Sequence, residues 1–135
     1  MAAKRKKTLT HHNPRAVAPP TVIYSLGVEV PAGARLLVTS GQIGCRKDGT
    51  IPKDMASQVE CALKNILALL KAAKMKPKNL VKVTVFLRHI EDAKTFRRVR
   101  DRILGTHAPA ETMIAVAGLG IPGMLVETEA IAAAV

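Results

Sequence analysis

Two glutamates near the carboxyl end of the sequence stand in an otherwise aliphatic segment. Glu127 and Glu129 lie two residues apart in the strand-like run Leu125–Ala134, so both side chains project from one face, about 7 Å apart. A carboxylate among aliphatic side chains is costly unless it has a partner. Glu127 is therefore a candidate general base. For both glutamates, the alternative is a salt bridge or a hydrogen-bond anchor to the backbone or to a neighbouring subunit.

Three further residues have side chains suited to a site. Tyr24 is the only tyrosine, and it either packs in the core or an interface with its hydroxyl hydrogen-bonded or borders a cleft. His107 lies four residues before Glu111, and a His–Glu couple can transfer protons. A solvated loop histidine and a solvated or paired glutamate are the alternative for that couple.

The cysteines and glycines predict neither a metal nor a cofactor. Cys45 and Cys61 lie far apart in the sequence with no close pair of ligands, which does not fit a zinc site. The glycine-rich segment 118–123 is not followed by a helical pattern, so it is not a phosphate-binding loop.

Three features of the sequence indicate the cellular compartment of the protein. Two cysteines make no disulfide framework and suit a reducing environment. No apolar run reaches the ~18 residues of a membrane span. The basic amino terminus lacks the apolar segment of a secretory signal. We therefore predict a cytoplasmic protein with no membrane segment.

Hydrophobic periodicity predicts an α+β fold. The expected elements are strands over Thr21–Val30 and Leu36–Ser40, a helix capped by Asp54, a strand over Leu80–Arg88, a helix over 91–104, and strands over Glu111–Ala117 and Leu125–Ala134. The first two strands are expected to form a hairpin. Right-handed crossovers in this β-β-α-β-α-β-β order place both helices on one face of a mixed sheet. The opposite face remains apolar, which favours self-association.

Charge separates an amino-terminal arm from a single domain. The chain has 135 residues and a net charge of +11, and five of its basic residues but no acid lie in residues 1–20. We predict a basic, mobile arm over 1–20 and one domain over 21–135. A basic chain suits an anionic partner, but only three aromatic residues are present to stack on bases. The composition therefore argues against nucleic-acid recognition.

Several segments, in their order and spacing, resemble the YjgF/RidA family. They are Leu36–Gly44 (LLVTSGQIG), Leu80–Phe86 (LVKVTVF), Pro109-Ala110 and Leu125–Ile131 (LVETEAI). The resemblance implies a chorismate-mutase-like subunit and a homotrimer with a central barrel-like core and three ligand clefts between subunits. It also implies hydrolysis of reactive enamines and imines to 2-oxo acids and ammonia, without a metal or cofactor. Other members are described as translation inhibitors or endoribonucleases.

The resemblance assigns roles to four residues. Tyr24 matches the tyrosine that borders the family's cleft, Ser40 and Gly41 match the strand end beside it, and Glu127 matches the glutamate that positions the attacking water. A fifth position departs from the family. Glu111 stands where the deaminases have the arginine that binds the substrate carboxylate.

The departure at Glu111 sets our expectation for activity. An ionised glutamate accepts hydrogen bonds and repels a carboxylate, whereas an arginine donates and attracts. We therefore predict a cleft between subunits that binds a small molecule through Tyr24, Ser40, Gly41 and Glu111, with Glu127 as the catalytic residue. A neutral or cationic imine is the expected substrate class, and 2-iminopropanoate is not. The alternatives are a non-catalytic ligand-binding or scaffolding trimer and an RNA-interacting protein.

Overall fold

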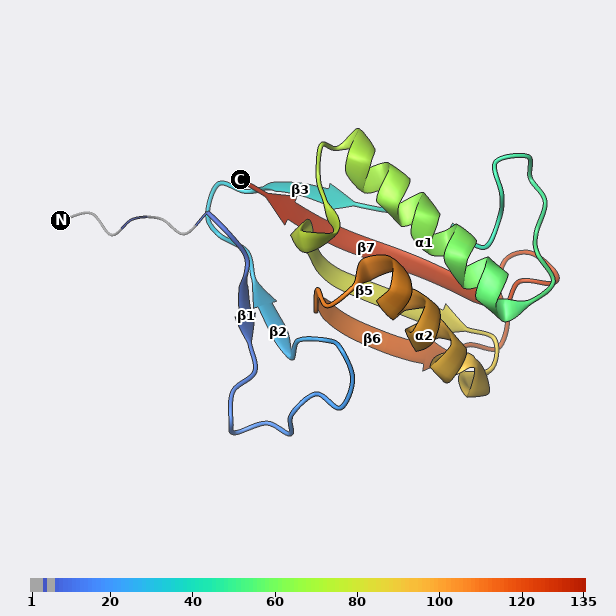
Figure 1. Cartoon of the computed structure of the whole chain (residues 1–135), viewed down its shortest axis with the longest axis horizontal. Coiled ribbons are helices and arrows are strands. Elements are labelled where there is room, and N and C mark those ends of the chain that lie inside the picture. The colour runs from blue at the N-terminus through green and yellow to red at the C-terminus, as the bar shows by residue number, and fades with distance from the viewer. Residues whose placement is uncertain (1–3, 5–6) are drawn as a thin grey trace.

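The computed structural model describes Lys4 and residues 7–135. In chain order the elements are β1 (Thr10–His12), β2 (Gly27–Glu29), β3 (Arg35–Val38), β4 (Gln42–Ile43), α1 (Met55–Ala72), η1 (Pro77–Asn79), β5 (Leu80–Leu87), η2 (Ile90–Asp92), α2 (Ala93–Leu104), β6 (Ala110–Ala115) and β7 (Val126–Ala134) (Figure 1). The two η elements are 3₁₀ helices of three residues.

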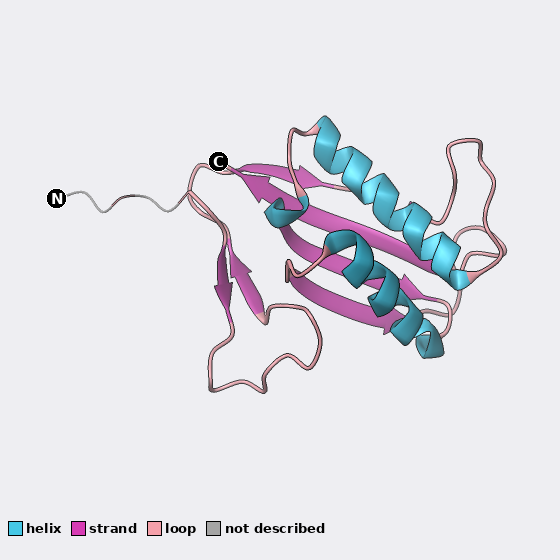
Figure 2. Ribbon diagram, in the orientation of Figure 1, coloured by secondary structure: helices cyan, strands magenta, loops and turns pink. Residues whose placement is uncertain are grey.

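The main sheet has the strand order β3-β7-β5-β6, and β4 also pairs with β7. The β5–β6 pair is parallel, and the pairs made by β7 are antiparallel. Both long helices cover the same face of this sheet, and the other face has no helix (Figure 2). This confirms the predicted α+β fold with two helices on one face of a mixed sheet.

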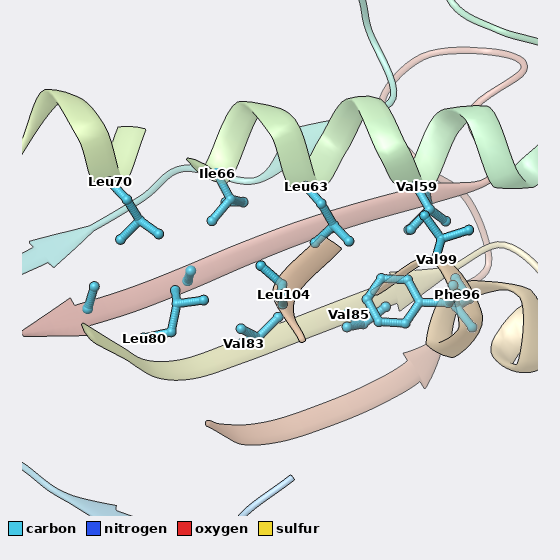
Figure 3. Close-up of a cluster of buried hydrophobic side chains, with 14 of the residues drawn as sticks. Val59, Leu63, Ile66, Leu70, Leu80, Val83, Val85, Phe96, Val99 and Leu104 are labelled. Atoms are coloured by element: carbon cyan, nitrogen blue, oxygen red, sulfur yellow. The ribbon is translucent and has the colours of Figure 1, made fainter. Parts of the chain in front are cut away.

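The core lies between the helices and that face of the sheet (Figure 3). The buried side chains that fill it include Val59, Leu63, Ile66 and Leu70 of α1, Leu80, Val83, Val85 and Leu87 of β5, and Phe96, Val99 and Leu104 of α2. The sequence predicts Val81 on the core face of β5. A register shift between Leu80 and Lys82 instead buries Leu80 and leaves Val81 partly exposed.

The amino-terminal region differs from the prediction. The expected hairpin between 21–30 and 36–40 does not form, because β2 pairs with β1. Polar side chains before β2 explain this choice: the Asn13 Oδ1 accepts from the Leu26 N–H at 2.8 Å, and the His12 Nε2 lies 2.8 Å from a Glu29 carboxylate oxygen. Residues 10–12, predicted as part of a mobile arm, are therefore held in a two-stranded sheet, and Asn13 is hydrogen-bonded to Leu26 beside it. Residues 1–3 and 5–6 of the predicted arm lie outside the described residues.

The β1–β2 hairpin meets the main sheet at the beginning of β6. The Ser25 N–H donates to the Pro109 carbonyl at 3.0 Å, and Ser25 forms an isolated parallel bridge with Ala110. β3 is consequently left as an edge strand, with Leu36 and Val38 exposed at 62% and 69%.

One buried amide joins the beginning of α1 to two loops. The Gln58 side chain is fully buried; its Nε2 donates to the Pro52 and Gly123 carbonyls at 2.8 and 2.9 Å, and its Oε1 accepts from the Leu125 N–H at 2.8 Å. Gly44 packs directly on this residue, since a Cβ there would lie 2.6 Å from the Gln58 Cα. Gln58 therefore fixes the loop before α1, the loop before β7 and the end of β4 relative to one another.

Replacing this amide should destabilise the fold. Gln58→Leu removes three hydrogen bonds to buried or partly buried backbone groups, at about 1–3 kcal/mol each, so we expect the free energy of unfolding in urea to fall by about 3–5 kcal/mol. Gln42→Leu is the control, because the Gln42 amide makes only a weak 3.4 Å contact to the Ser40 carbonyl. Equal losses for the two variants would contradict the role given to Gln58.

Candidate active site

Glu127 lies on the helix-free face of the sheet, in close contact with Gly41. The antiparallel pairings place it opposite Ile43 of β4 and Phe86 of β5. A Cβ on Gly41 would overlap the Glu127 carboxylate, so the carboxylate occupies space that only glycine leaves open. Ser40, exposed at the end of the β3–β4 link, immediately precedes this contact. The structure thus brings Ser40, Gly41 and Glu127 together.

A shallow hollow of about 290 Å³ opens beside Glu127. It is lined by Phe86, Val116, Gly118, Leu119, Gly120, Glu127 and Glu129. The two glutamates therefore share one face, as their spacing predicts. Neither of them forms an ion pair within 4.0 Å among residues 7–135. Their carboxylates thus border open space and are not used as salt-bridge anchors within the described chain.

Glu111 lies on the opposite face of the sheet from Glu127. It pairs with Val83 of β5, whereas Glu127 pairs with Phe86, and residues three apart on a strand project from opposite faces. On the helix-facing side, partial burial raises the pKa of the Glu111 carboxyl above its ordinary value. The nearby Arg100 and Arg97 guanidinium groups offset only part of this rise.

Tyr24 belongs with Glu111 rather than with Glu127. It is half-buried and directly precedes Ser25, which is hydrogen-bonded to the backbone just before β6. The five predicted site residues therefore fall into two groups within one chain. Tyr24 and Glu111 lie near the beginning of β6, and Ser40, Gly41 and Glu127 lie around β4, the first two just before it and Glu127 opposite Ile43.

Arg100 is a buried residue near this site that sequence reasoning missed. It is 2% exposed and donates to the His107 carbonyl at 2.6 Å, to the Gly105 carbonyl at 3.3 Å and to Asp101 at 3.0 Å. The signal was present in the sequence, because position 100 follows Phe96 by one helical turn on the buried stripe of α2.

His107 is half-buried and is not hydrogen-bonded to Glu111 in the described chain. Its Nε2 donates to the Leu80 carbonyl at 2.9 Å, and its ring meets that of His11 edge-on with centroids 5.4 Å apart. Partial burial lowers the pKa of the His107 imidazole, and the neighbouring His11 and Arg100 lower it further. The predicted His–Glu couple is therefore not formed.

The described residues, 4 and 7–135, contain no group of three or more His, Cys, Asp or Glu side chains placed to hold a metal ion. Over the same residues, no helix is both long enough and apolar enough to cross a membrane. The arrangement on the helix-free face offers a half-buried carboxylate at an open hollow, which is suited to orienting water and transferring protons.

Comparison with known proteins identifies relatives along nearly the whole chain. The family model described as endoribonuclease L-PSP matches residues 15–134. The 2-iminobutanoate/2-iminopropanoate deaminase of Escherichia coli K12 is 33% identical over 131 residues, covering 94% of this chain and 96% of the relative.

Solved structures agree with this assignment. The YjgF gene product of E. coli has a TM-score of 0.68 at 34% identity, with 94% of this chain and 97% of that chain covered. The Rid protein YyfB of Yersinia pestis, described as of unknown function, has the same fold, with a TM-score of 0.82 at 23% identity over 93% of this chain and 98% of that chain. The chain therefore belongs to the YjgF/RidA family, the group whose family model is described as endoribonuclease L-PSP.

Proposed function

We propose that this protein hydrolyses a small imine or enamine to a carbonyl compound and ammonia. The observation that carries the proposal is the Glu127 carboxylate, which borders an open hollow and packs on Gly41. The E. coli relative, named as a 2-iminobutanoate/2-iminopropanoate deaminase, supports the reaction class.

The chemistry requires only one water molecule and proton transfers. Glu127 accepts a proton from the water as the water oxygen bonds to the imine carbon, and the C=N π electrons move to nitrogen, which takes a proton from solvent. The resulting carbinolamine loses ammonia as Glu127 returns its proton to the departing nitrogen and the hydroxyl releases its proton to solvent to form the C=O bond. The net reaction consumes one imine and one water and releases one carbonyl compound and one ammonia.

A complete site of this kind needs more than one subunit. Within one chain, Glu111 and Glu127 project from opposite faces of the sheet, so one small ligand does not contact both. We propose a cytoplasmic homotrimer with a central barrel-like core and a ligand cleft between neighbouring subunits. There, Tyr24 and Glu111 of one copy meet Ser40, Gly41 and Glu127 of the next. The exposed Leu36 and Val38 of β3 supply apolar surface for such contacts.

Glu111 sets the substrate class in this proposal. Two like charges 4 Å apart repel by about 4 kcal/mol at an effective dielectric constant of 20. A substrate carboxylate beside Glu111 therefore loses affinity where an arginine would supply attraction. The proposed substrate is a neutral or cationic imine, and 2-iminopropanoate is excluded.

The first prediction concerns Glu127. Glu127→Gln should lower kcat for imine hydrolysis at least about 100-fold, because it removes the general base. The rate is measured as carbonyl release from an imine generated in situ, in competition with a semicarbazide trap. Glu91→Gln, an exposed change on η2, is the control and should retain the wild-type rate. Equal rates for wild type and Glu127→Gln would leave a ligand-binding or scaffolding trimer as the function.

The second prediction concerns specificity. The wild type should act on an imine without a carboxylate and should barely accelerate hydrolysis of 2-iminopropanoate. Glu111→Gln removes the negative charge, so kcat/KM for 2-iminopropanoate should rise about tenfold or more. The kcat/KM for the imine without a carboxylate should change little. A wild-type rate on 2-iminopropanoate equal to that of the E. coli relative would overturn the role of Glu111.

The third prediction tests the charge of Glu111 through stability. The pKa of Glu111 is raised in the folded protein, whereas an unfolded chain has a glutamate pKa of about 4.3. The folded state therefore loses stability as the pH rises from that value through the folded pKa, because Glu111 ionises less readily in the folded state. Glu111→Gln should therefore raise Tm near pH 7 and have no effect near pH 3.

Glu60 provides a control of opposite sign. Hydrogen bonds and charge from Lys64 and Arg102 lower the pKa of Glu60. Ionised Glu60 therefore stabilises the folded state when the pH is above the pKa that this residue has in the unfolded chain. Glu60→Gln should lower Tm slightly near pH 7. The same sign of change for the two variants would contradict the environment described for Glu111.

A further inference from the structure

A separate cavity of about 410 Å³ lies between residues 7–9, which precede β1, and the carboxyl end of β7. It is lined by Lys7, Thr8, Leu9, His11, Pro31, Lys78, Asn79, His107, Ala133, Ala134 and Val135. None of the five residues of the proposed imine site is among them. The inference below therefore does not rest on the proposed function.

The lining of this cavity is basic. Lys7 and Lys78 contribute two ammonium groups and His11 and His107 two imidazoles, whereas no Asp or Glu side chain lines the cavity. Within the described residues, neither lysine forms an ion pair within 4.0 Å. A concave wall with one sign of charge concentrates the electrostatic potential and attracts an anion.

Each histidine keeps one ring nitrogen without a protein partner. The His107 Nε2 donates to the Leu80 carbonyl, so its Nδ1 makes no hydrogen bond among residues 7–135. The His11 Nδ1 lies 2.8 Å from the Ser25 Oγ and 3.1 Å from the Ala108 carbonyl, and the His11 Nε2 makes no hydrogen bond among residues 7–135. These contacts fix the ring orientations and leave two imidazole nitrogens for a ligand.

Asn79 adds a neutral donor to the same wall. Its Oδ1 accepts from the Lys76 N–H at 2.8 Å, which leaves the Nδ2 amide hydrogens for a ligand. The ammonium groups and the amide N–H donate to phosphate oxygens, and each free imidazole nitrogen accepts from the hydroxyl of a singly protonated phosphate or donates once the ring is protonated. The volume exceeds that of a phosphate ion and falls within the range of about 300–1,000 Å³ for small-molecule sites.

We propose that this cavity binds a small phosphate monoester, with Lys78, Lys7, His11 and His107 around the phosphate group. Binding is tested on the full chain by isothermal titration at about 0.15 M salt, where charges beyond about 8 Å are screened. The probes are glycerol 3-phosphate, inorganic phosphate and acetate. We expect saturable binding of glycerol 3-phosphate, weaker binding of inorganic phosphate and none of acetate.

Two variants of equal charge change locate the site. Lys78→Gln should weaken binding of glycerol 3-phosphate about tenfold, because it removes an ammonium group from the wall. Lys76→Gln lies two residues away but does not line the cavity, so it should change the affinity less than about twofold. Since both residues are exposed on the same short turn, neither change threatens the fold.

The histidine resonances give a second measurement. On addition of glycerol 3-phosphate, the ring signals of His11 and His107 should shift in the NMR spectrum, and those of His89, which does not line the cavity, should not. Equal weakening by the two lysine variants, or no histidine shift at saturation, would overturn the proposal. The proposal would also be overturned if a short single-stranded RNA bound more tightly than glycerol 3-phosphate and both lysine variants weakened that binding equally. Such a result would indicate an extended basic surface.

Discussion

The position of the candidate catalytic carboxylate depends on the buried Gln58 amide. By accepting from the Leu125 N–H and donating to the Gly123 carbonyl, this side chain sets where β7 begins and hence which of its residues faces each neighbour. Gly44 packs on the same residue and fixes the end of β4, which pairs with β7 at Glu127. A displacement of one residue at the beginning of β7 would turn Glu127 to the helix-facing side, because successive side chains in a strand alternate between faces. The Gln58 amide therefore anchors the beginning of β7, and the pairing of β7 with β4 and β5 places the Glu127 carboxylate on the helix-free face.

The same alternation separates the two halves of the candidate site. β5 lies between β6 and β7, and it presents Val83 to Glu111 on one face and Phe86 to Glu127 on the other. The separation is built into the sheet, and no side-chain rotation removes it. A ligand that contacts both residues must lie between two chains. The proposed site therefore requires an oligomer, which is a stronger reason to propose one than the exposed apolar residues of β3 alone.

Sequence periodicity was sufficient to predict the helices and strands that form the core. It was not sufficient to predict which polar residues are buried within that core. The buried stripe of α1 and the alternation of β5 follow from apolar spacing alone, although a bulge shifts the first residues of β5. Gln58 and Arg100 were not predicted to be buried, because a polar residue interrupts the apolar pattern of a buried helix face. Only the folded structure shows the backbone groups to which their side chains are hydrogen-bonded. The β1–β2 pairing was missed because its short strands depend on partners such as Asn13, whose side-chain contacts no local pattern encodes. The family resemblance gave both Gly41 and Glu127 a role at the cleft, but their direct contact was not predicted, since it joins segments far apart in the sequence.

Two arginines lie near Glu111, but the contacts of their side chains explain why they do not neutralise this carboxylate. Arg100 is committed to Asp101 and to two backbone carbonyls, so its guanidinium has little capacity left for another carboxylate. Arg97 lies on the same side, but its Nε is buried without an acceptor and its Nη2 rests 3.8 Å from the Met113 sulfur, a weak acceptor. Neither cation forms an ion pair with Glu111 within 4.0 Å in the described chain. Burial therefore outweighs their attraction, and the net rise in the pKa of Glu111 records that imbalance. An ionised Glu111 is thus poorly compensated by the nearby cations, and the excess of positive charge elsewhere in the chain does not remove the repulsion that a substrate carboxylate would meet from it at β6.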